Sequence, residues 1–314
     1  MLSNTFCHLP GIGVRTEEKF WAAGVRCWDD FAQAASLVSP HKHAQAAGLL
    51  AESRERLEAG DAEFFATRLP PQEHWRLWPR FAHATAYLDI ETTGLGKGMD
   101  HITSIALFDG QSVRTYVHGK NLEDFQDDIR AFKLLVTYNG RSFDAPFIER
   151  EMRITLPKAH IDLRFLLKRV GLTGGLKRCE KALGLGRDEL DGVDGYFAVL
   201  LWRRYQDLGG QAADAALQTL LAYNVEDVLS LAPLLRHAAD KLLAASTFAG
   251  NSRTASRRSI PTRRTSPWCA GSRTSISGAV SRPPQKAHLQ RCRRKFKPSR
   301  IRNIIRDRKC FSFS

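Results

Sequence analysis

The sequence predicts an α/β protein in which a mixed sheet is flanked by helices, with a small helical module before it and a disordered basic tail after it. Residues 81–246 alternate short apolar runs with longer amphipathic stretches, which is the pattern of an α/β domain. Residues 1–80 are rich in alanine and follow a helical period, whereas residues 247–314 are rich in arginine and serine. These changes in composition divide the chain into three parts.

Within the α/β part, Gly, Asp and Asn residues bound four short runs that are rich in β-branched or aromatic residues. Such runs predict strands, and the longer amphipathic stretches predict helices. The strands are expected at about 84–90, 101–108, 112–118 and 133–138. The helices are expected at about 122–131, 143–153, 161–170, 176–183, 194–206 and 213–242.

The formal net charge of +14 comes from one end of the chain. Residues 251–314 contain 18 Lys and Arg and one acid, Asp307. Residues 1–250 contain 29 Lys and Arg against 32 Asp and Glu, so the part that is expected to fold is close to neutral. The strong positive charge is therefore a property of the tail and says little about the rest of the molecule.

Three interpretations of this tail remain open. It has too few apolar residues to form a core, which predicts disorder. Its 14 Arg and 4 Lys also suit a polycationic arm that binds phosphate backbones without reading sequence. An out-of-frame translation after a frameshift is the third, since Arg exceeds Lys, acids almost vanish and the change is abrupt. We base no function on this segment.

Several features narrow the class of protein. No run approaches about 18 consecutive apolar residues, so no membrane span is expected. The first residues have neither a basic segment nor an apolar one, which argues against a secretory signal. The six cysteines form no C-x-x-C pair, so we expect neither a zinc framework nor a disulfide scaffold, and the reducing cytoplasm is the expected compartment.

The sharpest local signal is a pair of acids on the first expected strand. Asp89 and Glu91 lie at i and i+2 of the run YLDIETTGL, so both side chains project from one face. Two carboxylates on one buried face repel each other and are costly to desolvate, and a divalent cation would compensate both effects. The alternative is a strand end whose acids face solvent.

Two weaker signals follow along the chain. Asp144 comes directly after the run LLVTYNGRSF, where a strand-to-helix turn would aim it back at the sheet, although Ser142 or Asp144 could also merely cap the next helix. Tyr223 and Asp227 lie at i and i+4 of a long helical stretch and therefore share a face. A tyrosine and an acid without a function on a half-exposed helix would show the same spacing.

Taken together and in this order, D-x-E, N-x-x-x-F-D and Y-x-x-x-D resemble the acidic motifs of the DEDD 3′–5′ exonucleases of the ribonuclease H-like fold. The stretch from Ala84 to about Leu243 resembles, more closely, the YprB-type ribonuclease H-like domain, which is half of the chain. Further matches are the segments HIDL at 160–163, GLKRCE at 175–180 with Leu183-Gly184, and Asp191-Gly192 before Ala198 and Trp202.

This resemblance implies two-metal hydrolysis of phosphodiester bonds. Two Mg²⁺ or Mn²⁺ ions would be held by the four acids Asp89, Glu91, Asp144 and Asp227. Asp89 would be the bridging ligand, and Tyr223 would position the attacking water. The residue four before Asp227 is a tyrosine, and Ala222 stands where the histidine of the other subtype would be, so the resemblance is to the tyrosine subtype.

Other polar residues allow two interpretations each. Lys177 and Arg178 could contact phosphate or could be inert charges at a helix start. Asp162 could support the metal ligands or could simply begin a helix, where an acid is favoured. Arg141 is equally ambiguous.

The segment LPGIGVRTEEKFWAAGV near the start of the chain resembles a helix-hairpin-helix element. Its turn, with Gly11 and Gly13, would present backbone N–H groups at a helix N-terminus, which suits a phosphate, and Arg15 is within reach. The same turn can serve helix packing alone, and Glu17 and Glu18 would repel a nucleic-acid backbone. Nucleic-acid contact by Gly11, Gly13, Arg15 and Lys177 is therefore an expectation.

The sequence thus predicts a metal-dependent 3′–5′ exonuclease that acts on DNA or RNA. One alternative is a ribonuclease H-like scaffold that binds nucleic acid without cutting it, which would suit a folded part that lacks a basic groove. Another is an endonuclease on the same fold. Contacts to the 2′-OH would distinguish RNA from DNA, and no spacing in the sequence reveals them.

Overall fold

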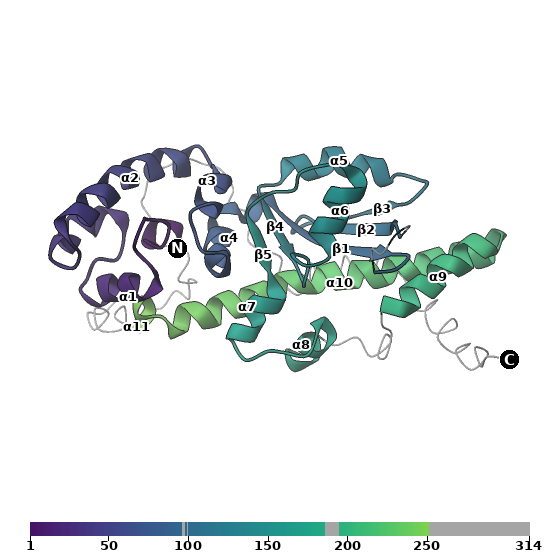
Figure 1. Cartoon of the computed structure of the whole chain (residues 1–314). Helices are drawn as coiled ribbons and strands as arrows, with labels where there is room; N and C mark the ends of the chain where they lie inside the picture. The colour runs from purple at the N-terminus through teal and green to yellow at the C-terminus, as the bar shows by residue number, and fades with distance from the viewer. Residues whose placement is uncertain (96–97, 99, 186–194, 251–314) are drawn as a thin grey trace.

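The computed structural model describes residues 1–95, 98, 100–185 and 195–250. Of the predicted tail 247–314, residues 247–250 are described, whereas residues 251–314 and the pair Asp191-Gly192 lie outside the described residues. Figure 1 shows that the N-terminal helices form a group beside the sheet, and that one long helix runs along both the group and the sheet. The chain is an α/β protein, as the sequence predicts.

Five strands form one mixed sheet in the order β3-β2-β1-β4-β5. β1 pairs with β2 and β2 with β3 in antiparallel fashion, whereas β1, β4 and β5 run parallel. Their bounds are β1 Thr85–Thr92, β2 Ile102–Phe108, β3 Val113–Val117, β4 Leu134–Thr137 and β5 His160–Asp162. The first four strands lie where the sequence predicts them.

β5 is absent from the sequence prediction, which has a helix over 161–170. The structure places a strand first, and the helix α7 (Leu163–Arg169) begins only after it. β5 has three residues, too few to show a period, and it is fixed by parallel pairing with β4 through Leu135↔His160 and Val136↔Ile161. A tertiary contact therefore overrides the local helical pattern.

Helices cover both faces of the sheet (Figure 1). One face is covered by α10, which extends from Gly210 to Ala245 with Pro233 inside it. The other face is covered by α5 and α6, whose apolar residues pack against β1 and β2. The remaining elements of this part are α5 Phe125–Asp128 between the 3₁₀ helices η5 Leu122–Asp124 and η6 Ile129–Ala131, α6 Asp144–Met152, α8 Leu176–Ala182 and α9 Gly195–Asp207.

The alternation of side chains along β1 decides what faces α10. Ala86, Leu88 and Ile90 belong to the apolar cluster on the side of α5 and α6. The residues between them, Tyr87, Asp89 and Glu91, point to the other side because successive side chains of a strand alternate. The two acids of the D-x-E motif therefore face the helix that carries Asp227.

In residues 1–84, the elements are all α-helices or 3₁₀ helices, and turns connect them. The elements are η1 Leu2–Asn4, α1 Val14–Ala22, η2 Trp28–Ser36, α2 Pro40–Glu58, α3 Ala62–Ala66, η3 Pro71–Leu77, α4 Trp78–Phe81 and η4 Ala82–Ala84. Aromatic rings fill their core, with Phe6, Phe20 and Phe31 in mutual contact and Trp28 stacked on Phe65. Among the described residues, no helix has the length and apolarity needed to cross a membrane.

The end of α10 returns to this helical part. α11 (Thr247–Gly250) packs on α1, where the ring of Phe248 lies 5.4 Å from that of Trp21. The Arg26 guanidinium lies over the same phenylalanine ring, 5.1 Å from its centroid, and donates a hydrogen bond to the Phe248 carbonyl. Residues more than 200 positions apart in the sequence are thus in direct contact.

A buried ion network also joins the two parts. Arg76 of η3 is 4 % exposed and pairs with Glu17 of α1 at 2.6 Å and with Glu73 at 2.7 Å. Arg169 of α7 pairs with the other oxygen of Glu73 at 3.0 Å. The expectation that Glu17 would repel a nucleic-acid backbone is wrong, because its carboxylate is buried and neutralised by Arg76.

Arg76→Met should destabilise the protein by about 3–5 kcal/mol, because it leaves the buried carboxylate of Glu17 without its cation and removes one of the two arginines that pair with Glu73. Urea unfolding would measure the loss. Arg56→Met is the matched control: Arg56 pairs with Glu52 and Asp61 at the surface, where the effect should stay below about 1 kcal/mol. Equal stabilities of the two variants would contradict this role of Arg76.

Candidate metal centre and active site

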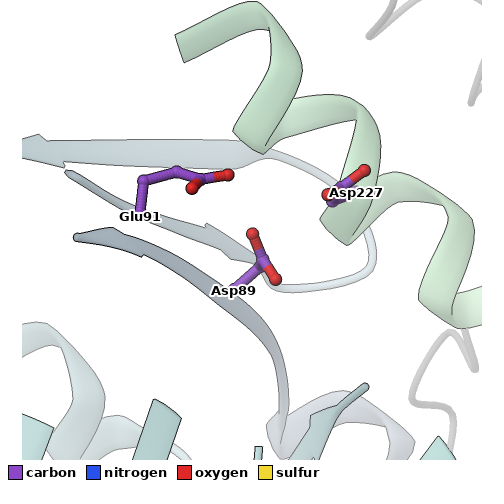
Figure 2. A group of neighbouring side chains, drawn as sticks. All are labelled: Asp89, Glu91 and Asp227. Carbon is purple, nitrogen blue, oxygen red and sulfur yellow. The ribbon is translucent and has the colours of Figure 1, made fainter. Parts of the chain in front are cut away.

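Three carboxylates from two elements converge on one point. Asp89 and Glu91 come from β1, and Asp227 comes from the middle of α10. Each offers one oxygen, and the three oxygens all lie within 4.8 Å of one another. Figure 2 shows the three side chains directed toward a shared space between the strand and the helix. The two distant motifs of the sequence therefore meet.

Burial and mutual repulsion make this cluster costly in its charged form. Glu91 is 9 % exposed, Asp227 is 7 % exposed and Asp89 is half-buried. Burial first, and then the charges of Asp227 and Asp144, raise the pKa values of Asp89 and Glu91 well above their ordinary range. Without a cation, the cluster therefore holds protons that isolated carboxylates would lose.

Asp144 is a fourth carboxylate beside this group. It is the first residue of α6, and its Oδ1 accepts a hydrogen bond from the backbone N–H of Ile90 at 3.3 Å, between the two acids of β1. Burial raises its pKa to about 7, and the charges of Asp162 and Asp227 act in the same direction. The interpretation of Asp144 or Ser142 as a mere helix cap is wrong, since the N-cap position is Phe143 and no side chain caps the helix.

Asn224 and Ser104 complete the surroundings of Asp89, and no motif in the sequence points to either residue. The Asn224 Nδ2 group donates to Asp89 Oδ2 at 2.7 Å and to the Asp89 carbonyl at 3.2 Å. Ser104, which lies opposite Glu91 on β2, donates to Asn224 Oδ1 at 3.1 Å. The amide is fully buried and fixes the orientation of the carboxylate. The only feature of the sequence that points to Asn224 is its position next to Tyr223.

Asp162 organises the turn that precedes Asp144. Its carboxylate accepts hydrogen bonds from the backbone N–H groups of Asn139 at 2.8 Å and Arg141 at 3.2 Å. It also caps α7 by accepting from the N–H of Arg164. The expectation that Asp162 begins a helix is confirmed. The carboxylate also holds the backbone of the segment before Asp144, and a role in supporting metal ligands stays a prediction.

Lys177 and Tyr223 lie together next to the acids. The Lys177 ammonium is 4.3 Å from the centroid of the Tyr223 ring. Its charge also lowers the pKa of Glu91, which places it close to the carboxylate cluster. Tyr223 is 5 % exposed and packs among apolar residues of α9 and α10. Arg178, the next residue, is exposed.

The glycine turn of the helical part lies apart from these acids in the chain and on different elements. Gly11 has a φ of +71°, which a residue with a side chain rarely adopts, and Gly13 is the N-cap of α1. Arg15 is exposed at the start of that helix. The proposed contact of Gly11, Gly13 and Arg15 with nucleic acid stays a prediction.

The raised pKa values predict how the stability depends on pH. Since the folded-state pKa of Asp144 is about 7, above its ordinary value, the folded chain binds more protons than the unfolded chain between these values. Without divalent ions, the melting temperature should therefore fall as the pH rises from about 4 to about 7. Excess Mg²⁺ should raise it at about pH 8 by more than at about pH 5, because the ion then meets charged carboxylates.

Thermal unfolding in EDTA and in Mg²⁺ at both pH values would measure this. Asp89→Asn should lose most of the Mg²⁺ response, whereas Asp127→Asn, an exposed acid on α5, should keep it. A Mg²⁺ response that is equal at the two pH values, or unchanged in Asp89→Asn, would contradict the assignment.

Asn224→Leu should weaken Mn²⁺ binding by about ten-fold while the fold persists, because losing the partner of a ligand disturbs its orientation. The affinity can be read from the Mn²⁺ dependence of the melting temperature. Gln218→Leu, at an exposed position of the same helix, is the control. An Asn224→Leu variant with wild-type Mn²⁺ affinity would show that the amide has no such role.

Comparison with known proteins agrees with this geometry. The model of the ribonuclease H superfamily matches residues 86–239, which include all four acids. The uncharacterized protein YprB of Bacillus subtilis strain 168 is 30% identical over 185 residues, which cover 51% of this chain and 43% of that protein. The chain thus spans less than half the length of this relative. No solved structure matches the chain. The chain therefore contains a ribonuclease H-like domain of the YprB type.

Proposed function

We propose that this chain is a metal-dependent 3′–5′ exonuclease that hydrolyses phosphodiester bonds of nucleic acids. The ribonuclease H-like domain itself indicates a hydrolase that acts on nucleic acid. The observation that carries the finer proposal is the convergence of Asp89, Glu91 and Asp227 within 4.8 Å, with Asp144 beside them. A structural role would not require four neighbouring carboxylates, three of them buried, since their repulsion opposes folding.

The donor set suits Mg²⁺ or Mn²⁺. All the candidate ligands are carboxylate oxygens, which hard divalent cations prefer over nitrogen or sulfur. Asp89, Glu91, Asp144 and Asp227 would hold the ions. When bound, such ions would lower the pKa of a water molecule and stabilise charge on the phosphate oxygens.

The chain's own residues would prepare the reaction. Asn224 fixes the Asp89 carboxylate through a hydrogen bond of 2.7 Å, which would orient it as a ligand. The phenol of Tyr223 would orient the attacking water by a hydrogen bond, for which it need not ionise. Lys177 lies over the Tyr223 ring and lowers the pKa of Glu91, and its positive charge would attract a substrate phosphate. The choice of the 3′ end follows the resemblance of the Y-x-x-x-D motif to the tyrosine subtype.

A second candidate is a scaffold that binds nucleic acid without cutting it. Residues 1–250 carry slightly more acids than bases, which is unusual for a protein that tracks a phosphate backbone. The complete acid set favours the enzyme, because a binding protein gains nothing from buried carboxylates that repel phosphate.

A cleavage assay separates the two. DNA and RNA labelled at the 5′ end, single- and double-stranded, would be incubated with Mg²⁺, Mn²⁺ or EDTA. We expect a metal-dependent ladder that shortens from the 3′ end, and Asp89→Ala or Asp227→Ala should reduce the rate by about a hundred-fold or more. Both variants should melt near or above the wild-type temperature in EDTA, because repulsion is relieved.

Glu123→Ala, at an exposed position before α5, is a matched loss of a carboxylate that should leave the rate unchanged. Internal cuts in place of a 3′ ladder would indicate an endonuclease. A folded protein that binds metal and nucleic acid but cuts neither DNA nor RNA would support the scaffold instead.

A further inference from the structure

A cavity of about 280 Å³ lies between η3 and α7, outside the acid cluster. Its walls include Trp75, Ile161, Phe165 and Leu166. The volume is just below the roughly 300–1,000 Å³ of pockets for whole small molecules, so it suits a single ring system. Arg141 and Arg169 also line it, so that planar apolar walls and guanidinium groups occur together.

The outer face of α7 continues the same chemistry. Phe165 is 51 % exposed, which is unusual for so large an apolar side chain. Arg164, Lys168 and Arg169 are exposed on the same short helix. An exposed aromatic ring among cations is the combination that binds single-stranded nucleic acid, where bases stack on the ring and cations neutralise phosphates.

The cavity is linked to the acids by Asp162, which lines it and ends β5. The same carboxylate holds the turn that precedes Asp144, and its charge helps to raise the pKa of Asp144. β5 runs parallel to β4 and β1, so the carboxyl ends of these strands lie at one edge of the sheet. A nucleic-acid strand whose 3′ end reached the acid cluster would therefore pass close to α7.

We propose that this cavity binds one unstacked nucleobase of the substrate strand, with Phe165 as the stacking surface and Lys168 near the adjoining phosphate. The proposal rests on the proposed function insofar as the substrate is a nucleic acid. A single strand or a frayed end presents an unstacked base at less cost than a paired duplex, so the site would favour single-stranded substrate. The cations of α7 favour a phosphate-bearing ligand over an apolar segment of a protein.

The test is a binding experiment that does not depend on cleavage. The full chain in an Asp89→Asn background would be titrated into fluorescent single-stranded oligonucleotides in Mg²⁺ and followed by anisotropy. Phe165→Ala should weaken binding by about ten-fold, Phe165→Leu nearly as much, and Phe165→Trp little, because stacking needs an aromatic face. Lys168→Ala should reduce the slope of log K against log salt by about 0.7.

Arg130→Ala removes an exposed cation from η6, on the opposite face of the sheet, and should change neither the affinity nor the salt dependence.

A second experiment locates the base. A series of oligonucleotides would each carry one abasic residue at a different position. At one position, the abasic residue should weaken binding by the chain with Phe165 about ten-fold relative to the intact oligonucleotide, and Phe165→Ala should abolish that difference.

The outcomes separate this inference from the proposed function. Wild-type affinity of Phe165→Ala in a chain that cleaves nucleic acid would overturn the inference alone, and so would equal binding of single and double strands. Binding with the expected Phe165 and abasic effects, but without cleavage by the wild type, would support the inference and contradict the exonuclease. A folded chain that binds no nucleic acid would overturn both.

Discussion

The repulsion among four neighbouring carboxylates is the constraint that the rest of this structure must satisfy. Asp89 and Glu91 project from one strand, Asp227 from helix α10 and Asp144 from the first residue of helix α6, and burial makes each charge harder to accommodate. Neighbouring groups hold the acids in place: Asn224 donates to Asp89, a backbone N–H donates to Asp144, and the charge of Lys177 lowers the pKa of Glu91, which still stays well above its ordinary value. Such an arrangement is stable when a cation completes it, which ties metal binding to the stability of the fold.

Helix α10 connects this constraint to the whole molecule. Its middle carries Asn224 and Asp227, and its far end continues into α11, where Phe248 packs on Trp21 of the helical part. The buried network around Arg76 provides a second connection, because Glu73 binds both Arg76 and Arg169 of α7. The helical part thus supports the two helices, α7 and α10, that border the cavity and the acids.

The sequence predicts those parts that depend on local patterns. Four strands and the long helix have clear periods, and the i, i+2 and i, i+4 spacings place Asp89 with Glu91 and Tyr223 with Asp227. The remaining features depend on contacts between distant residues. β5 is fixed by its pairing with β4, Glu17 is neutralised by an arginine 59 positions away, and Asn224 meets Asp89 across 135 positions. No local pattern encodes such contacts, and the cavity beside Phe165 arises in the same way.

The central claim is that the acid cluster exists to hold divalent cations. Counting bound Mn²⁺ by electron paramagnetic resonance at about pH 8, where the carboxylates are charged, tests it most directly. We expect the wild-type chain to bind Mn²⁺ stoichiometrically, Asp89→Asn to lose this binding, and a variant of an exposed acid such as Asp127→Asn to retain it. A folded wild-type chain that binds no Mn²⁺, or an Asp89→Asn variant that binds as much as the wild type, would contradict it.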